Sequence, residues 1–315
     1  MIVVVSHPED DHATRVLAAL SARQHPAALV DTGRFPAQAI LTQRFGTADR
    51  GVRLVVDGED VDLAEARVGW WRRPRPFALH EGIDPDVASF AYSECHEAMM
   101  GVLAALGLAW VNPPALDEAA HHKPFQLQVA TEVGLRVPRT LITNEPGAAV
   151  DFHRQNGPGR TVYKTFLATE EHWRETRILQ PDEIGMLDTV AYAPVIFQEF
   201  VPAVADIRAT VLGKTVIAAA ITPAPQGYAY DYRMDMAGAR FEPTTVRPDT
   251  QQALLALMRR LGIVYGAVDL RRTPEGEEVF LEVNPAGEWL FVEERTGQPI
   301  TEAMADLLVS MDGGP

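Results

Sequence analysis

The chain has 315 residues, of which 47% are hydrophobic, and a formal net charge of −15. This acidic balance argues against nonspecific binding to nucleic acid or to an anionic membrane surface, because both need a basic field. No apolar run is long enough to cross a bilayer, the first strand is not preceded by a basic signal segment, and the single Cys95 excludes an intrachain disulfide. We therefore expect a cytoplasmic globular protein of about two to three domains.

The N-terminal part alternates strands and helices. Strands are predicted at residues 1–6 and 28–32, with a helix that ends near Arg23 between them. This β-α-β order predicts an α/β domain with a parallel sheet. No glycine-rich loop follows the first strand, which argues against an ordinary dinucleotide-binding fold. We interpret His7 and His12, which lie among acidic residues, as a solvated helix start rather than a metal cluster.

Residues 68–76 have the most unusual composition in the chain, with two tryptophans, three arginines and two prolines. Arg72 and Arg73 could clamp an anion or a peptide, with their guanidinium groups stacked on indole rings. They could equally neutralise acidic side chains of the protein itself, and the sequence leaves both readings open. A hairpin over residues 53–63 precedes this segment; a helix over 86–106 and a strand over 108–114 follow it. The first domain is predicted to end at residue 114.

Residues 115–192 are predicted to form a second unit. A helix over 116–133 carries Lys123, and strands follow at 135–143 and 161–166. Lys164 lies in the middle of the second strand, where a lysine is costly to bury without a partner, so we expect it to meet an anion or an acid. A short acidic helix is predicted over 180–190.

Residues 193–315 are predicted to form the third unit. It begins with a strand at 194–202 and a hairpin over 206–222 that turns at Gly213 and Lys214. Asp206, Arg208 and Thr210 share one face of that hairpin. A loop over 223–241 is expected to cover the site, and helices are expected over 250–261 and 301–310.

A second hairpin in this unit is predicted to hold a metal. Apolar runs at 264–270 and 279–283 flank the turn-forming residues 274–277. If the hairpin is symmetric about the bond between residues 275 and 276, Asp269 lies opposite Glu282, and Asn284 joins the same face. Opposed carboxylates repel unless a cation, a proton or water lies between them, and oxygen ligands suit Mg²⁺. An exposed acidic face is the alternative reading.

The order of these features resembles the ATP-grasp superfamily over about residues 110–310, and the first hundred residues resemble its preceding domain. The features are Asn112-Pro113, Lys123, residues 134–138, Lys164, Gln198-Glu199, residues 206–208, and finally Asp269, Glu282 and Asn284. Residues 71–74, 193–200, 282–289 and 293–300 are most similar to the graspetide maturases, the microviridin-type ligases that crosslink side chains of ribosomally made precursor peptides. The resemblance implies an ATP-grasp fold, in which two α+β subdomains clasp ATP, preceded by an N-terminal α/β pre-ATP-grasp domain.

The resemblance also implies a role for each candidate residue. Lys123 and Lys164 would contact the nucleotide phosphates, and Lys164 would act in catalysis together with Arg208, which would hold the transferred phosphate or the acceptor carboxylate. Adenine and ribose would lie against Gln198, Glu199, Phe200, Val201 and Asp206. Asp269, Glu282 and Asn284 would bind Mg²⁺, with two ions in the site. A precursor peptide, with leader and core, would contact Arg72, Arg73, Asp182, Glu183, Glu288 and Trp289.

The implied activity is that of an ATP-dependent ligase. It would activate Asp or Glu side chains of the peptide as acylphosphates and form ester or amide crosslinks with Ser, Thr or Lys. The first alternative is a ligase that appends free amino acids to a protein or peptide, as glutamate ligases do, and the second is a noncatalytic ATP-binding module. One departure from many ATP-grasp proteins is the lack of a glycine-rich loop at residues 166–173. Whether the chain forms a homodimer is left open.

Overall fold

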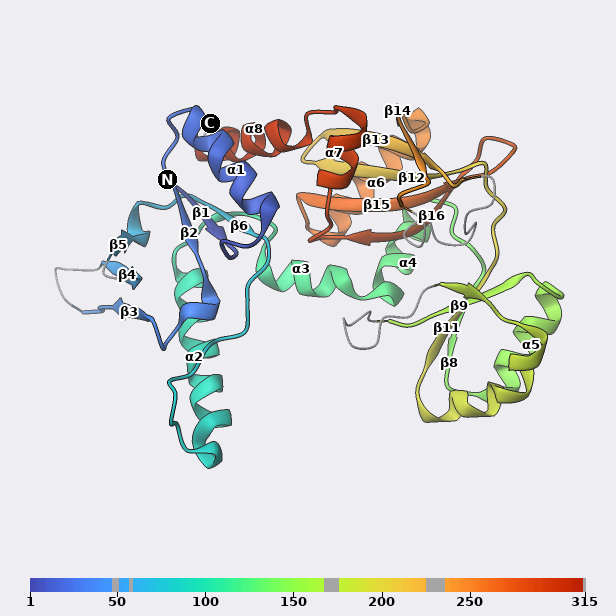
Figure 1. Ribbon diagram of the computed structural model, residues 1–315, viewed down its shortest axis with the longest axis horizontal. Coiled ribbons are helices and arrows are strands. Elements are labelled where there is room, and N and C mark those ends of the chain that lie inside the picture. The colour runs from blue at the N-terminus through green and yellow to red at the C-terminus, as the bar shows by residue number, and fades with distance from the viewer. Residues whose placement is uncertain (47–50, 57–58, 167–175, 225–235, 314–315) are drawn as a thin grey trace.

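The computed structural model describes residues 1–46, 51–56, 59–166, 176–224 and 236–313. Three sheet-containing regions follow one another along its long axis (Figure 1). In this part of the chain no helix has both the length and the apolarity needed to span a membrane. The predicted loop at 223–241 and the segment 166–173 lie largely outside the described residues.

The N-terminal region is built on a parallel sheet, as predicted. Its strand order is β2-β1-β6-β7. Its strands are β1 (Ile2–Val5), β2 (Ala27–Val30), β6 (Val68–Trp71) and β7 (Ala109–Val111), and its helices are α1 (Asp11–Ala22) and α2 (Pro85–Ala105). Every residue of β1 is fully buried, which explains its continuous apolar run. The predicted hairpin is β4 (Val52–Val56) with β5 (Glu59–Asp62), and β3 (Ala39–Gln43), which we did not predict, adds a third antiparallel strand.

The central region has an antiparallel sheet in the order β10-β9-β11-β8. The strands are β8 (Thr140–Thr143), β9 (Thr161–Lys164), β10 (Arg177–Ile178) and β11 (Val195–Glu199). Helix α5 (Pro146–Asn156), which was not predicted, and the 3-10 helix η3 (Pro181–Tyr192) pack on one face through an apolar cluster that includes Phe197 and Leu187. The other face carries Lys164 and Gln198.

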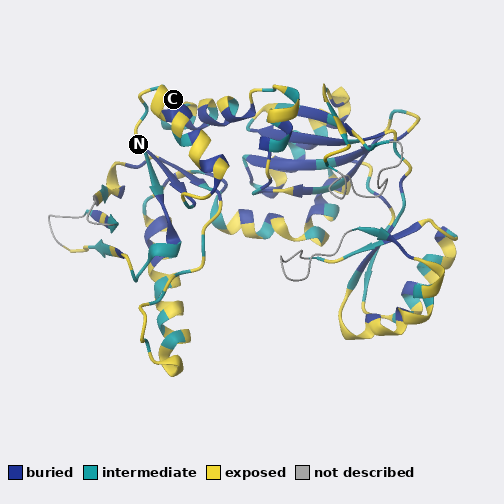
Figure 2. Ribbon diagram, in the orientation of Figure 1, coloured by how far each residue is buried: buried dark blue, intermediate teal, exposed yellow. Residues whose placement is uncertain are grey.

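The C-terminal region has an antiparallel sheet in the order β14-β13-β12-β15-β16. Its strands are β12 (Ala205–Leu212), β13 (Thr215–Thr222), β14 (Arg240–Thr244), β15 (Tyr265–Arg272) and β16 (Glu278–Asn284). The helices are α6 (Pro248–Leu261), α7 (Leu290–Thr296) and α8 (Ile300–Asp312). In Figure 2, the inner strands β12 and β15 of this sheet are coloured as buried along most of their length. Both predicted hairpins are confirmed.

One helix predicted from the sequence forms two helices in the structure. The segment 116–133 forms α3 (Pro114–His121) and α4 (Lys123–Glu132), separated by an extended His122. Pro124 explains the break, because its ring would clash with the carbonyl group four residues earlier in a continuous helix. The break places Lys123 in the first turn of α4, next to β16.

The N-terminal and C-terminal regions share one core. It joins residues of α1, β1 and β6 to Tyr265, Trp289 and the inner face of α8. Trp289 is fully buried and stacks on Trp70 with ring centroids 6.0 Å apart. The segment that follows the predicted metal ligands is therefore packed against the N-terminal region.

Candidate functional site

The hairpin of β15 and β16 places the predicted metal ligands on one face. Asp269 pairs with Glu282, and Ala267 pairs with Asn284. The predicted symmetry is wrong near the turn, where Leu270 pairs with Phe280. A bulge after Asp269 adds one residue to β16 and restores the predicted pairing at the carboxylates.

Each carboxylate of this pair has a cationic partner. Lys123 Nζ lies 2.7 Å from Glu282 Oε2, and Arg208 Nη1 lies 2.9 Å from Asp269 Oδ1. The lysine comes from α4 and the arginine from β12, the strand next to β15. Three regions of the sequence therefore meet here, and the two cations offset the repulsion that facing carboxylates would otherwise suffer.

The donor set suits a hard cation. Asp269 and Glu282 supply carboxylate oxygens, and the exposed Asn284 supplies an amide oxygen that also accepts a 3.0 Å bond from the Ala286 N–H group. Mg²⁺ prefers oxygen ligands and needs only one or two protein carboxylates beside water and phosphate. Among the described residues no group of three His, Cys, Asp or Glu side chains could hold a metal, so the predicted donor set is two carboxylates and one amide.

Arg208 is held on both sides. Its side chain is almost fully buried, and its second terminal nitrogen donates to the carbonyl oxygen of Glu288 at 3.0 Å. Its guanidinium group also lies 5.7 Å from the ring centroid of Phe291 in α7. These contacts fix a cation beside the predicted metal ligands, where it could offset negative charge on a reactant.

The predicted nucleotide residues surround the connection between the central and C-terminal sheets. Gln198 is buried and donates to Thr140 Oγ1 at 2.9 Å. Asp206 forms an ion pair with Arg271 at 3.0 Å, and Arg271 lies over the ring of Phe200. Lys164 pairs with Ile196 in the central sheet.

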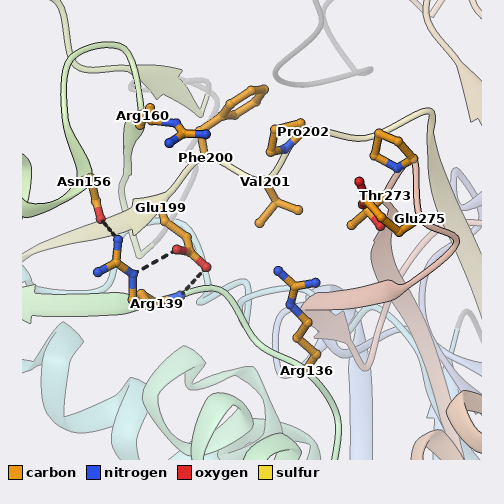
Figure 3. Close-up of a pocket in the computed structure, with 11 residues that line it drawn as sticks. Arg136, Arg139, Asn156, Arg160, Glu199, Phe200, Val201, Pro202, Thr273 and Glu275 are labelled. Atoms are coloured by element: carbon orange, nitrogen blue, oxygen red, sulfur yellow. Dashed lines mark hydrogen bonds and ion pairs between the residues drawn. The ribbon is translucent and has the colours of Figure 1, made fainter.

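The Glu199 side chain is bound within the protein. Its carboxylate accepts from Arg139 Nε at 2.9 Å, and it lines a cavity of about 340 Å³ (Figure 3). Val201 and residues 273–275 of the β15–β16 turn also line this cavity. The contact of Glu199 with the nucleotide stays a prediction.

Two of the predicted peptide contacts are corrected. Arg72 and Trp289 are 1% and 0% exposed, so neither side chain presents a surface to a peptide. Arg72 instead forms a buried ion pair with Asp10 at 3.2 Å, which is the alternative reading of the arginine-rich segment. Arg73 and Glu288 remain at the surface, paired at 2.6 Å.

The acidic 3-10 helix carries two of the predicted peptide contacts, and only one of these side chains is exposed. Asp182 is exposed. Glu183 is engaged within the protein, because it accepts hydrogen bonds from the Tyr163 hydroxyl and the Gln180 N–H group, both at 2.9 Å, and pairs with Arg177. A peptide would have to displace these bonds to reach Glu183.

A buried network that we did not predict joins the N-terminal region to the site. His12 Nε2 accepts from the N–H groups of Trp289 and Leu290 at 3.0 and 3.2 Å. Arg72 donates to the carbonyl oxygens of Ala286 and Gly287. His12 is thus a buried acceptor, and our interpretation as a solvated helix start was wrong for this residue.

Asp10 contacts both side chains of this network, Arg72 and His12. It pairs with Arg72, accepts from Ser6 Oγ at 2.8 Å and lies 3.5 Å from His12 Nδ1. Burial raises the pKa of Asp10, but the hydrogen bonds from His12 and Ser6 and the charge of Arg72 outweigh it and hold that pKa well below its usual range. The only sequence signals for the network were the unusual arginine segment and a histidine in the first turn of a helix.

Comparison with known proteins shows what the chain is similar to. Residues 1–118 match the MvdD pre-ATP grasp domain. The structure is similar to that of macrocyclase MdnC bound with precursor peptide MdnA from Microcystis aeruginosa MRC, with a TM-score of 0.87, 28% identity, and coverage of 98% of this chain and 99% of that one. The chain has an ATP-grasp fold and is similar to the graspetide maturases over almost its whole length. The predicted fold is confirmed.

Two further relatives bear on the activity of this chain. ATP-grasp ligase PsnB, complexed with a phosphomimetic variant of minimal precursor, Mg and ADP, has a TM-score of 0.79 and 27% identity over 99% of this chain and 98% of that one. A probable alpha-L-glutamate ligase 2 of Shewanella amazonensis is 28% identical over 216 residues, which are 67% of this chain and 68% of the relative. The relatives are thus ATP-dependent carboxylate ligases, in agreement with the predicted class of enzyme.

Proposed function

We propose that this protein uses ATP and Mg²⁺ to join side chains of a precursor peptide through ester or amide bonds. The observation that carries the proposal is the facing pair of Asp269 and Glu282 beside Asn284, with Lys123 and Arg208 as cationic partners. In a protein with a net charge of −15, these local cations would favour the binding of a triphosphate.

Each of the proposed site residues would contact either ATP or Mg²⁺, according to its position. Lys123 and Lys164 would bind the phosphates of ATP, and the adenine would lie against the backbone at Glu199 and Val201. Asp269, Glu282 and Asn284 would hold Mg²⁺, and two ions are part of the proposal. The bound metal would neutralise charge on the phosphate oxygens and orient them.

The reaction would proceed in two displacements on the substrate. A carboxylate oxygen of a peptide Asp or Glu attacks the γ-phosphorus of ATP, and ADP leaves. A Ser or Thr hydroxyl, or a Lys amine, then attacks the acyl carbon, loses its proton and expels phosphate. Arg208 would face the negative oxygens in both steps, so catalysis consists of positioning and electrostatic stabilisation.

The proposed peptide contacts are confined to exposed side chains. Asp182 on η3 and the Arg73–Glu288 pair beside the site remain candidates. The Shewanella relative favours a second candidate function, the addition of free amino acids to a peptide or protein. The full-length match to a macrocyclase favours crosslinking.

The metal assignment is tested by Asp269→Asn and Glu282→Gln. Each variant should fold and lose ATP turnover by roughly 100-fold or more, because a charged ligand at the transferred phosphate is removed. Glu275→Gln, in the exposed turn of the same hairpin, is the matched control and should retain turnover. Full turnover in either ligand variant would remove the assignment.

A further inference from the structure

The strand that carries two of the three proposed metal ligands is an edge strand. β16 is the last strand of the five-stranded sheet, so one side of its backbone has no neighbouring strand among the described residues. The free N–H and C=O groups of an edge strand must find partners outside the sheet, either in water or in other groups of the protein. Near the turn, the carbonyl oxygen of Arg136 does this by accepting from the Phe280 N–H group at 2.8 Å.

Gln126 takes the equivalent place next to the ligands. Its Oε1 accepts from the Val283 N–H group at 3.0 Å, and its Nε2 donates to the Val283 carbonyl oxygen at 2.8 Å. The same Nε2 donates to the carbonyl oxygen of Ala120 at 2.6 Å, and the side chain is only 2% exposed. The carboxamide therefore makes the pair of hydrogen bonds that one residue of a neighbouring strand would make.

Val283 lies between the two ligands of β16. Its side chain enters the core, while Glu282 and Asn284 project to the opposite face because strand side chains alternate. Fixing the backbone of Val283 thus fixes the origin of both ligand side chains. Lys123, three residues before Gln126 in α4, contacts Glu282 from the same helix face.

We propose that Gln126 is a positioning residue for the metal site, acting through Val283. The proposal rests on the assignment of Asp269, Glu282 and Asn284 to Mg²⁺. Without the carboxamide, the end of β16 loses its partner on the free side, and Glu282 and Asn284 no longer start from a fixed backbone. Metal affinity should then fall, as it commonly does by about 10- to 100-fold when a group supporting a ligand is lost.

The test compares Gln126→Met with Gln128→Met. Methionine keeps the size of the side chain and removes both bonds to Val283, while Gln128 is exposed on the same helix and bonds only to Glu132 among the described residues. Mn²⁺ binding in the presence of ADP, followed by electron paramagnetic resonance, and hydrogen exchange of the Val283 amide are measured on the full chain. Gln126→Met should weaken Mn²⁺ binding by about 10- to 100-fold and speed Val283 exchange, and Gln128→Met should change neither.

Several results would overturn the proposal. Unchanged Mn²⁺ affinity in folded Gln126→Met, with only a lower Tm, would make Gln126 a stability residue. If that variant does not fold, Gln126→Asn, whose shorter amide cannot reach Val283, is compared in the same way. Fast exchange of the Val283 amide in the wild-type protein would contradict the proposal without any variant. Retained Mn²⁺ binding by Asp269→Asn would instead refute the metal assignment itself, so the two failures are distinguishable.

Discussion

Arg208 and Asp269 face each other on adjacent strands, with Nη1 of the arginine 2.9 Å from Oδ1 of the aspartate. The second terminal nitrogen of Arg208 binds the carbonyl oxygen of Glu288. One guanidinium group therefore connects the proposed metal ligands to the segment after them. A change that moves Arg208 should disturb catalysis without unfolding the chain.

Gly287→Ala should produce such a movement. A Cβ atom at this position would lie 2.4 Å from the Ala267 Cβ and 3.0 Å from Arg208 Nη2. We expect ATP turnover with peptide to fall by roughly 100-fold, because displacement of a positioned group by about 1 Å has that effect. Gly101→Ala in α2, where a Cβ atom would meet no other segment of the described chain within 4 Å, should leave turnover unchanged and slightly raise Tm. Equal turnover in both variants would contradict the role of Arg208.

Lys123→Met should change the affinity for metal and the affinity for nucleotide in opposite directions. The Nζ atom lies 2.7 Å from Glu282 and competes with a metal for that carboxylate, so its removal should tighten Mn²⁺ binding. The loss of a phosphate contact should weaken ATP binding by about 10- to 100-fold, the value of a charge-assisted hydrogen bond. Titration calorimetry with each ligand separates the effects. If neither affinity changes, the lysine has no role in the site.

Arg72→Met should destabilise the folded protein by about 3–5 kcal/mol, because it leaves Asp10 buried without its ion-pair partner. Arg73→Gln removes a pair that is about half exposed and should cost no more than about 1 kcal/mol. Chemical denaturation measures both values. Similar losses for the two neighbours would contradict the buried role of Arg72.

His12 should make stability depend on pH. Burial lowers the pKa of His12 and outweighs the opposing hydrogen bond with Asp10. Below about pH 6.5 the unfolded chain therefore binds more protons than the folded one, so the free energy of unfolding falls as the pH falls through that value. His12→Gln should flatten this dependence between about pH 7 and 5, and exposed His80→Gln should preserve it. An unchanged slope in His12→Gln would refute this explanation.

The sequence predicted the elements that depend on local signals. The hairpins turn at Gly213 and Gly276, whose φ angles of 60° and 82° favour glycine, and their strands alternate regularly. The meeting of Asp269 with Glu282 followed from that alternation. The parallel N-terminal sheet followed from its β-α-β order and the continuous apolar first strand.

Contacts between distant segments could not be predicted in this way. The burial of Arg72 depends on Asp10, and that of His12 on the backbone after Trp289, so neither is visible in local composition. The bulge in β16 shifts the register by one residue, and no glycine in the sequence marks its position. In the sequence, Gln126 cannot be distinguished from other helical glutamines. Its role becomes visible only from the contact of α4 with β16. The division at residues 114 and 192 and the peptide contacts stay predictions.

The central claim is tested most directly by the mass of a peptide product. The enzyme is incubated with ATP, Mg²⁺ and a short peptide, rich in Thr and in Glu or Asp, that is encoded beside its own gene. Crosslinking predicts the loss of one water for each bond formed, with ADP and phosphate released in step, and no loss with Asp269→Asn. A product that gains the mass of added amino acids, or ATP hydrolysis with an unchanged peptide, would contradict the account.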